Sequence, residues 1–256
     1  MSAGLEPHPA GTRIRIGCAG WSLSAADRSS FGGGDSLLQR YATRLSLVEI
    51  NSSFYRPHLP QTYRRWAASV PDDFRFTVKM PRSISHEQRL RGAGPLLDPF
   101  LAAVEELGSR LGALLLQLPP SLAYEPQHVE PFLHDLRRRT RRPVACEPRH
   151  PSWFSAEVDA LLAVHDIARV AADPARVAQA GEPGGARGWS YWRWHGQPDI
   201  YRSAYDETTL ARLAGLLRDR ARAGHCAWMI LDNTAQGHAV SNALRLQALL
   251  GEHGHA

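Results

Sequence analysis

Short runs of β-branched and aliphatic residues recur along the chain and alternate with longer amphipathic stretches. The starts of these runs are about 30 residues apart on average, which is the length that a strand, a turn, a helix and a second turn require. The pattern therefore predicts a series of βα units with a parallel sheet. We expect eight strands, over residues 14–18, 47–50, 74–79, 113–118, 143–147, 168–172, 190–195 and 226–231.

The amphipathic stretches predict the helices between these strands. Ser155 stands where an N-cap is expected, directly before an apolar stripe at helical spacing. Pro131 is expected in the first turn of its helix, because a proline in a helix interior removes a backbone hydrogen bond. We expect helices over residues 95–111, 129–138, 158–165, 210–221 and 244–250.

The unit between the sixth and seventh strands differs from the others. Residues 174–188 hold four glycines and two prolines, which predicts a short helical turn or an irregular loop instead of a full helix. Eight βα units in 256 residues predict a closed (β/α)8 barrel of the TIM type, with a degenerate sixth helix unit. A doubly wound α/β sheet is the alternative, but no glycine-rich phosphate loop follows any predicted strand. We expect one barrel domain over residues 13–250, with tails at 1–12 and 251–256.

The composition is that of a folded chain without a strong charge bias. Hydrophobic residues make up 43% of the chain, the formal net charge is +5 and the isoelectric point is near 9.4. This basic excess is weaker than that of a dedicated nucleic-acid-binding protein. No segment matches a signal peptide, and no apolar run reaches the ~20 residues that span a bilayer. We therefore expect a cytoplasmic protein, whose three widely spaced cysteines are buried thiols.

Polar and aromatic residues gather where each predicted strand ends. In a barrel the carboxyl ends of the strands meet at one mouth, where the loops build the active site. Glu49 and Asn51 share a face of their strand, as do Arg193 and His195. A charge inside the barrel is costly unless it is paired or used, so these residues are candidates for function. The set consists of Trp21, Glu49, Asn51, Tyr55, Lys79, Arg82, His86, Gln117, Glu147, Arg149, His150, Trp153, Asp173, Arg193, His195, Asp232 and Asn233.

Structural roles compete with functional ones at several positions. Lys79 also suits a buried ion pair with Glu49 or Glu147. The tryptophans favour packing over substrate stacking, and Trp192 and Trp194 are expected to face the helices because they alternate with the inward-facing residues of their strand. The basic run at 137–142 is most simply a solvated helix end. Because it precedes the fifth strand, we expect it at the N-terminal end of the barrel, away from the mouth.

Several of these segments resemble one protein family. They are residues 16–21 (IGCAGW), 48–55 (VEINSSFY), 79–86, 116–120 (LQLPP), 147–153 (EPRHPSW), 193–196 (RWHG) and 232–234 (DNT). Over residues 13–250 the chain resembles domain-of-unknown-function family 72, the YecE-like proteins. The resemblance implies a TIM-type barrel. This sequence departs from the family's usual pattern at Asp232, where asparagine is common, and in the short sixth unit. It implies no reaction, because none is established for the family.

The residues expected at the mouth favour an enzyme. Carboxylates beside imidazoles supply acid–base candidates, and we assign Glu147, His150, His195 and Glu49 as catalytic residues. The other thirteen residues of the set are assigned to ligand binding, with their arginines suited to planar contacts with an anion. We expect hydrolase or lyase chemistry on a small phosphate- or carboxylate-bearing substrate, without a cofactor or a metal.

Two other functions stay open. The carboxylates and imidazoles would suit zinc or manganese in a metal-dependent phosphodiesterase or endonuclease, although Lys79 and two arginines nearby would repel a divalent ion. A barrel that only binds a nucleotide or nucleic acid is the third possibility. A small anionic substrate is favoured over nucleic acid, because no basic run is expected near the mouth.

Overall fold

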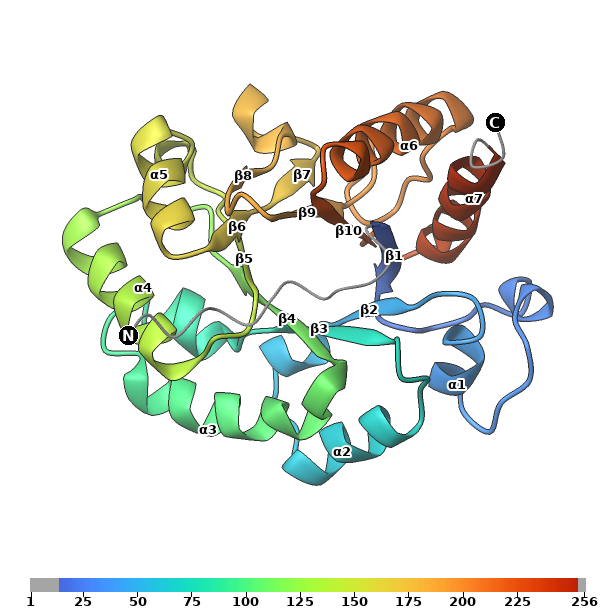
Figure 1. Ribbon diagram of the computed structural model, residues 1–256, viewed down its shortest axis with the longest axis horizontal. Helices are drawn as coiled ribbons and strands as arrows, with labels where there is room; N and C mark the ends of the chain where they lie inside the picture. The colour runs from blue at the N-terminus through green and yellow to red at the C-terminus, as the bar shows by residue number, and fades with distance from the viewer. Residues whose placement is uncertain (1–13, 253–256) are drawn as a thin grey trace.

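All eight predicted strands form in the computed structural model, which describes residues 14–252 (Figure 1). The tail predicted at 1–12 and residues 253–256 of the other predicted tail lie outside the described residues, whereas residues 251–252 continue the last helix. The barrel strands are β1 (Ile14–Ala19), β2 (Leu47–Ile50), β3 (Arg75–Lys79), β4 (Leu111–Gln117), β5 (Val144–Glu147), β6 (Ile167–Arg169) with β7 (Ala171–Asp173), β9 (Trp189–Trp194) and β10 (Cys226–Leu231).

The strands pair in parallel around a ring. The order runs from β1 through β2, β3, β4 and β5 to β6, and from β7 through β9 and β10 back to β1. The segments β6 and β7 are halves of one strand, separated by Val170, and each half pairs with a different neighbour. Three residues of β6 pair with β5, and three residues of β7 pair with β9. This shared strand closes the ring and confirms the TIM-type barrel.

Helices surround the ring of strands (Figure 1). Ser155 caps its helix as predicted, because its side chain accepts a hydrogen bond from the Val158 backbone N–H. The sixth unit lacks an α-helix, again as predicted, and holds a 3-10 turn (Ala178–Gly181) and a short strand, β8 (Gly184–Gly185). The α-helices are α1 (Leu37–Tyr41), α2 (Pro60–Ala68), α3 (Gly94–Val104), α4 (Pro126–Arg139), α5 (Ala156–Val164), α6 (Glu207–Arg222) and α7 (His238–Glu252). Within residues 14–252, none of these helices is long and apolar enough to cross a bilayer.

The barrel interior is apolar over most of its height. Alternation along the strands turns Tyr191 and Trp228 inward, where they pack with small and branched residues such as Leu115. A side chain at Gly112 would collide with the Trp228 indole, so the glycine makes room for this ring. Trp192 and Trp194 belong to the other cluster, between the strands and the helices, as predicted. Charged side chains of the interior are therefore confined to its ends.

The helix α4 differs from the sequence prediction in two ways. It begins at Pro126, so Pro131 lies in its interior and the predicted first-turn position is wrong. The expectation of a solvated basic run is wrong at Arg137, which is buried. The Arg137 guanidinium donates to the backbone carbonyls of His165, Asp166 and Arg142, at 2.6, 2.9 and 2.7 Å. These carbonyls follow the last residues of α5 and α4, so the arginine joins two helix ends at the N-terminal end of the barrel.

Arg137→Met should lower the free energy of unfolding by about 3 kcal/mol, because it leaves the three backbone carbonyls that accept from Arg137 without their charged donor. Arg138→Met is the matched control: Arg138 is exposed, and its loss should change stability by no more than about 0.5 kcal/mol. Urea unfolding of the two variants checks this. Equal effects at both positions would show that the buried contacts of Arg137 contribute nothing particular.

Candidate active site

A buried guanidinium lies among three carboxylates at the carboxyl ends of the strands. Arg193, the penultimate residue of β9, contacts Glu49 of β2 through Nε and Nη2, at 3.0 and 2.8 Å from Oε1. Its Nη1 lies 3.1 Å from Glu147 Oε2 of β5, and its Nη2 lies 2.9 Å from Asp232 Oδ2, just after β10. Arg193 is 1% exposed. Arg193, and not Lys79, forms the ion pairs with Glu49 and Glu147, so the structural role considered as an alternative for Lys79 is not the one that the structure shows.

His195 lies between two of the same carboxylates. Its Nδ1 is 3.0 Å from Asp232 Oδ2, and its Nε2 is 2.9 Å from Glu147 Oε1. The Arg149 guanidinium also reaches this corner, with Nη2 at 2.6 Å from Glu147 Oε1 and 3.0 Å from His195 Nε2. Since Asp232 can only accept, Nδ1 carries a proton when the carboxylate is ionised. At Nε2, the imidazolium would donate to Glu147, whereas the neutral ring would accept from Arg149.

The cations around these carboxylates hold them ionised. Burial alone would raise the pKa of Glu147, but Arg149, Arg193 and His195 lower it well below its usual value. The pKa of Asp232 is lowered in the same way, against burial, by Arg193 and His195. Ionised carboxylates with low pKa values are poor proton donors at neutral pH. The geometry therefore places Glu147 and Asp232 as partners that orient His195.

Lys79 differs from the other buried cations of the site. It ends β3 and is 7% exposed, and its Nζ lies 4.3 Å from the centroid of the Phe54 ring. Among residues 14–252, no carboxylate lies within ion-pair distance of this Nζ. Burial and the positive charge of Arg193 lower the pKa of Lys79 to about 8, although Glu49, Glu147 and Asp232 oppose this shift. Lys79 is also the only lysine in a chain that contains 29 arginines.

Two further predicted residues lie beside this cluster. The amide of Gln117 donates to Glu147 Oε2 at 2.8 Å, because the two residues are paired in neighbouring strands. The His86 ring contacts Phe54, with 4.9 Å between ring centroids, and its Nδ1 lies 2.9 Å from the Ser85 hydroxyl. Burial and the charges of Lys79, then of Arg82 and Arg149, lower the pKa of His86. Gln117 and His86 are thus close to the charged cluster, as expected.

Other predicted residues make structural contacts instead. Trp153 is fully buried and donates to the Leu122 carbonyl at 2.9 Å. His150 caps the 3-10 turn that follows it, and its Nδ1 accepts from the Ser152 backbone N–H. Asn233 is buried and donates to Ser203 and Asn242. Asp173 accepts hydrogen bonds from Tyr205 and Gln197, at 2.7 and 2.6 Å. The side-chain contacts of these residues do not involve Arg193, although the Asp173 carbonyl accepts from the His195 backbone N–H at 2.7 Å.

The remaining predicted residues lie in the loops after β1, β2 and β3. Trp21 packs edge-on against Trp66 of α2, with 5.1 Å between centroids. Tyr55 is 74% exposed. Arg82 forms an exposed ion pair with Glu87 at 3.0 Å. The buried Oδ1 of Asn51 has no hydrogen-bond partner among the described residues, nor has the buried Nε of Arg149.

Sequence reasoning missed three aromatic residues of the site. Tyr191 donates to Glu49 Oε2 at 3.0 Å, and its position two residues before Arg193 places both on one face of β9. Phe54 lies under Lys79. Tyr201 packs edge-on against His195, with 5.5 Å between centroids, from a loop where its φ is +69°. The alternation of β9 was a usable signal for Tyr191, whereas nothing periodic marks Tyr201.

The carboxylates do not form a cation-binding cage for a metal. Glu49, Glu147 and Asp232 surround the Arg193 guanidinium, which already occupies the position that a shared metal ion would take. Within the described part of the chain, no group of three or more His, Cys, Asp and Glu side chains is arranged to hold a metal ion. In this structure the three carboxylates are paired with the Arg193 guanidinium.

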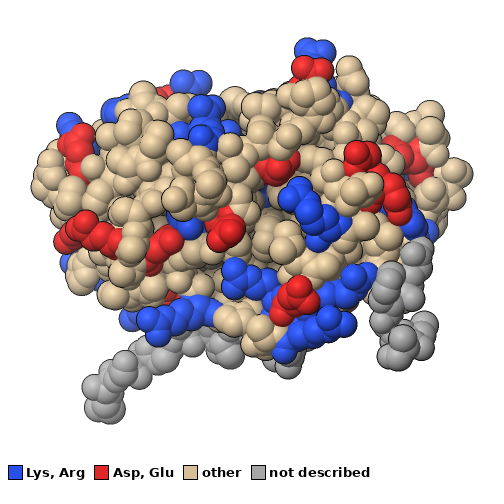
Figure 2. Space-filling view, turned by 90° about the horizontal axis from the view of Figure 1, so that it is seen from above, with Lys and Arg blue, Asp and Glu red and all other residues tan. Residues whose placement is uncertain are grey.

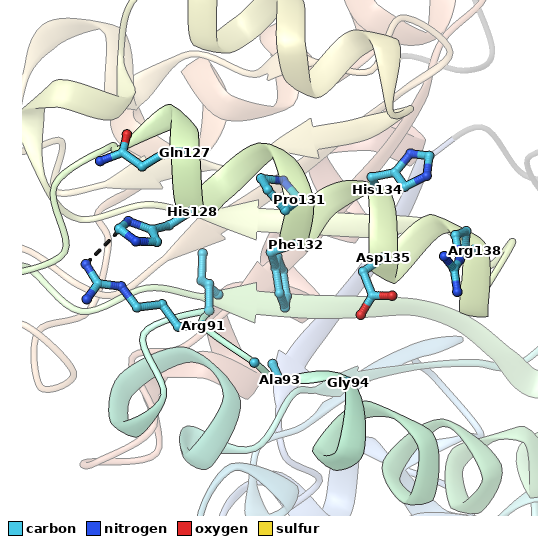
Figure 3. A pocket seen from close by; sticks show the side chains of 12 residues that line it. Arg91, Ala93, Gly94, Gln127, His128, Pro131, Phe132, His134, Asp135 and Arg138 are labelled. Carbon is cyan, nitrogen blue, oxygen red and sulfur yellow. Dashed lines mark hydrogen bonds between the residues drawn. The ribbon is translucent and has the colours of Figure 1, made fainter.

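A hollow of about 440 Å³ lies elsewhere, on the outside of the barrel (Figure 3). It lies between residues 90–94, at the start of α3, and one side of α4, which contributes Phe132. Arg91 and His128, which line it, both contact Glu125, at 3.3 and 2.9 Å. None of its lining residues is one of the predicted site residues, so this hollow is separate from the candidate site.

The family of the chain follows from its sequence. A family described as "Protein of unknown function DUF72" matches residues 15–256. The chain belongs to this family. Among DUF72 relatives, the UPF0759 protein YecE of Escherichia coli K12 is 33% identical over 143 residues, which are 56% of this chain and 50% of YecE. The UPF0759 protein YunF of Bacillus subtilis 168 is 25% identical over 148 residues, 56% of this chain and 52% of YunF. These alignments thus span about half the length of each relative.

Solved structures of DUF72 proteins share the fold. A family member from Enterococcus faecalis V583 superimposes with a TM-score of 0.79 at 22% identity, covering 93% of this chain and 95% of its own. A member from Thermotoga maritima MSB8 gives 0.77 at 24% identity, covering 93% and 99%. At these identities the likeness shows the fold alone, and it agrees with the TIM-type barrel. The resemblance expected from the sequence motifs is confirmed.

Arg193→Met should lower the free energy of unfolding by roughly 3–5 kcal/mol, because it leaves three buried carboxylates without their common partner. Adding Glu49→Gln to this variant should recover part of the loss, since one uncompensated charge is removed. Thermal and urea unfolding of the single and double variants measure both effects. An Arg193→Met variant as stable as the parent would contradict an organising role for the guanidinium.

Acid should weaken the fold through Glu147. Its pKa in the folded protein lies well below the usual 4.5, so the unfolded chain takes up the proton first as the pH falls. The stabilisation is therefore complete above pH 4.5 and is lost progressively below it. Urea unfolding between neutral and acidic pH should show this loss, with a shallower pH dependence in Glu147→Gln. An identical pH dependence in both proteins would rule out this contribution.

Proposed function

We propose that this DUF72 protein is an enzyme of hydrolase or lyase type, which acts on a small carboxylate- or phosphate-bearing substrate at the barrel mouth. The observation that carries the proposal is that the cations of the site differ in their exposure and in how many carboxylates they contact. Arg193 contacts three carboxylates and is 1% exposed, so it is committed to the protein. Arg149, whose side chain is 14% exposed, contacts Glu147 of the same cluster, and Lys79 is 7% exposed and forms no ion pair with a described carboxylate.

Arg149 is the residue best suited to the anion. Its side chain is 14% exposed, and a single Nη atom makes its contacts with Glu147 and His195. The unpartnered Nε is itself buried, so the donors left for a ligand oxygen are those of the partly exposed guanidinium end. A guanidinium with free donors matches the planar geometry of a carboxylate or the face of a phosphate. When it is protonated, Lys79 at the end of β3 adds a second positive charge to the site.

His195 supports proton transfer at the same place. Each of its protonation states has a hydrogen-bonding partner for Nε2, namely Glu147 for the imidazolium and Arg149 for the neutral ring. Asp232 fixes the ring through Nδ1 in both states. A ring that keeps its orientation while it gains or loses a proton is suited to general acid–base catalysis.

The surface favours a small ligand over a nucleic acid. On the face shown in Figure 2, basic and acidic side chains are interspersed, with the basic ones densest along one edge. Several surface arginines are paired with carboxylates, such as Arg142 with Glu105 and Arg245 with Glu207. Paired cations neutralise fewer phosphates than a continuous basic surface would.

Arg149→Met should weaken the binding of a small carboxylate or phosphate by at least about tenfold, the effect of losing one charge-assisted contact. Calorimetric titration with a panel of keto acids and sugar phosphates measures it. The matched control is Arg222→Met, which removes an arginine that is 75% exposed near the end of α6. The proposal fails if no anion of the panel binds, or if a labelled oligonucleotide binds instead with an affinity that falls steeply as salt rises.

A further inference from the structure

The single lysine of the chain stands where an amine has a chemical use. The sequence contains 29 arginines and one lysine, so, histidines aside, every other basic side chain of the chain is a guanidinium. This includes the buried positions Arg137, Arg169 and Arg193, each held by charge-assisted hydrogen bonds. A guanidinium stays protonated at any pH that proteins meet, whereas an amine can release its proton and attack carbon. Lys79 is thus the only side chain of this sequence that carries a primary amine.

The surroundings of Lys79 differ from those of a structural cation. Buried ammonium groups are ordinarily paired, but among residues 14–252 no carboxylate lies within ion-pair distance of Lys79 Nζ. Its neighbour is the face of Phe54, at 4.3 Å from the ring centroid. The nearby carboxylates are all in contact with Arg193. Lys79 Nζ therefore packs against an aromatic ring and not against a carboxylate, and Lys79 is 7% exposed.

We propose that Lys79 forms an imine with the carbonyl carbon of an anionic substrate. This inference rests on the proposed function and narrows its substrate to small carbonyl acids or carbonyl phosphates. The uncharged amine attacks the carbonyl carbon, a C–N bond forms and the carbonyl π bond opens to a hydroxyl. Loss of that hydroxyl with the second amine proton releases one water and leaves the C=N bond. The imidazoles of the site that are available to carry these protons are His195 and His86, whose ring contacts Phe54 as Lys79 does.

Electrostatics makes the uncharged amine accessible. Burial and Arg193 lower the pKa of Lys79 to about 8 from its usual 10.5, so a sizeable fraction is uncharged slightly above neutral pH. The rate of imine formation should therefore rise with pH and level off above 8. For an ordinary lysine the rise would continue toward 10.5. Phe54 on one side also limits water around the nitrogen.

Borohydride trapping tests the imine directly. Hydride adds to the imine carbon and a solvent proton to the nitrogen, which turns the adduct into a stable secondary amine. The full chain is incubated with pyruvate and borohydride, and peptide mapping by mass spectrometry locates the adduct. Only Lys79 and the α-amino group of the chain are primary amines, so assignment is unambiguous. We expect the adduct at Lys79 in the parent and at neither position 79 nor its peptide in Lys79→Arg, which keeps the charge.

Acetone, a ketone like pyruvate but without the carboxylate, serves as the uncharged comparison probe. Pyruvate should label Lys79 about tenfold faster than acetone at equal concentration, and Arg149→Met should remove most of this advantage. Melting curves of Lys79→Arg and Arg149→Met establish that both variants are folded. A labelling rate of the parent with a midpoint near pH 8 supports the proposal, and one near 10.5 overturns it.

The two proposals fail in different ways. If neither probe labels Lys79 although pyruvate binds in the calorimeter, the imine is overturned and the anion site stands. If acetone labels Lys79 as fast as pyruvate does, the imine stands and the anion-selective function is overturned. Labelling of Lys79→Arg at the same peptide would overturn the assignment of the nucleophile.

Discussion

One buried guanidinium organises the carboxyl end of this barrel. Arg193 of β9 contacts carboxylates from β2, β5 and the residue after β10, and so ties together strands from around the whole ring. Without it, three negative charges would lie close together in a water-poor interior, which is strongly unfavourable. Because Arg193 satisfies Glu147 and Asp232, these carboxylates are ionised and able to hold His195 in place. The positions of His195, Gln117 and Arg149 all depend on this arrangement.

Most of the fold could be predicted from the sequence, because period and spacing decide it. The apolar runs located all eight barrel strands, and the glycines and prolines of 174–188 located the unit without an α-helix. Two errors have a common cause. Pro131 and Arg137 were placed by average preferences for helix interiors and helix ends. The helix in fact begins earlier, at Pro126, and Arg137 donates to backbone carbonyls after the next helix, α5. Preferences along one helix carry no information about its neighbours.

The sequence predicted some of the residues that form the site, but not which cation pairs with which carboxylate. Strand-end position and alternation indicate that Glu49, Arg193 and His195 meet, since a barrel brings all strand ends to one mouth. Which cation takes which carboxylate depends on side-chain length and barrel stagger, so Arg193 and not Lys79 pairs with Glu49. Tyr201 comes from a loop, where no period applies. The count of a single lysine was a signal in the sequence that position alone did not reveal.

The strand shared by β6 and β7 leaves a seam in an otherwise continuous ring. Each half contributes three paired residues, and the connection that follows has no α-helix to brace it. Residues 167–172 are nevertheless buried, so the seam is held by packing as well as by its short ladders. The seam also reaches the site, because the His195 backbone N–H donates to the Asp173 carbonyl at the end of β7. The closure of the barrel and the backbone position of His195 therefore depend on the same divided strand.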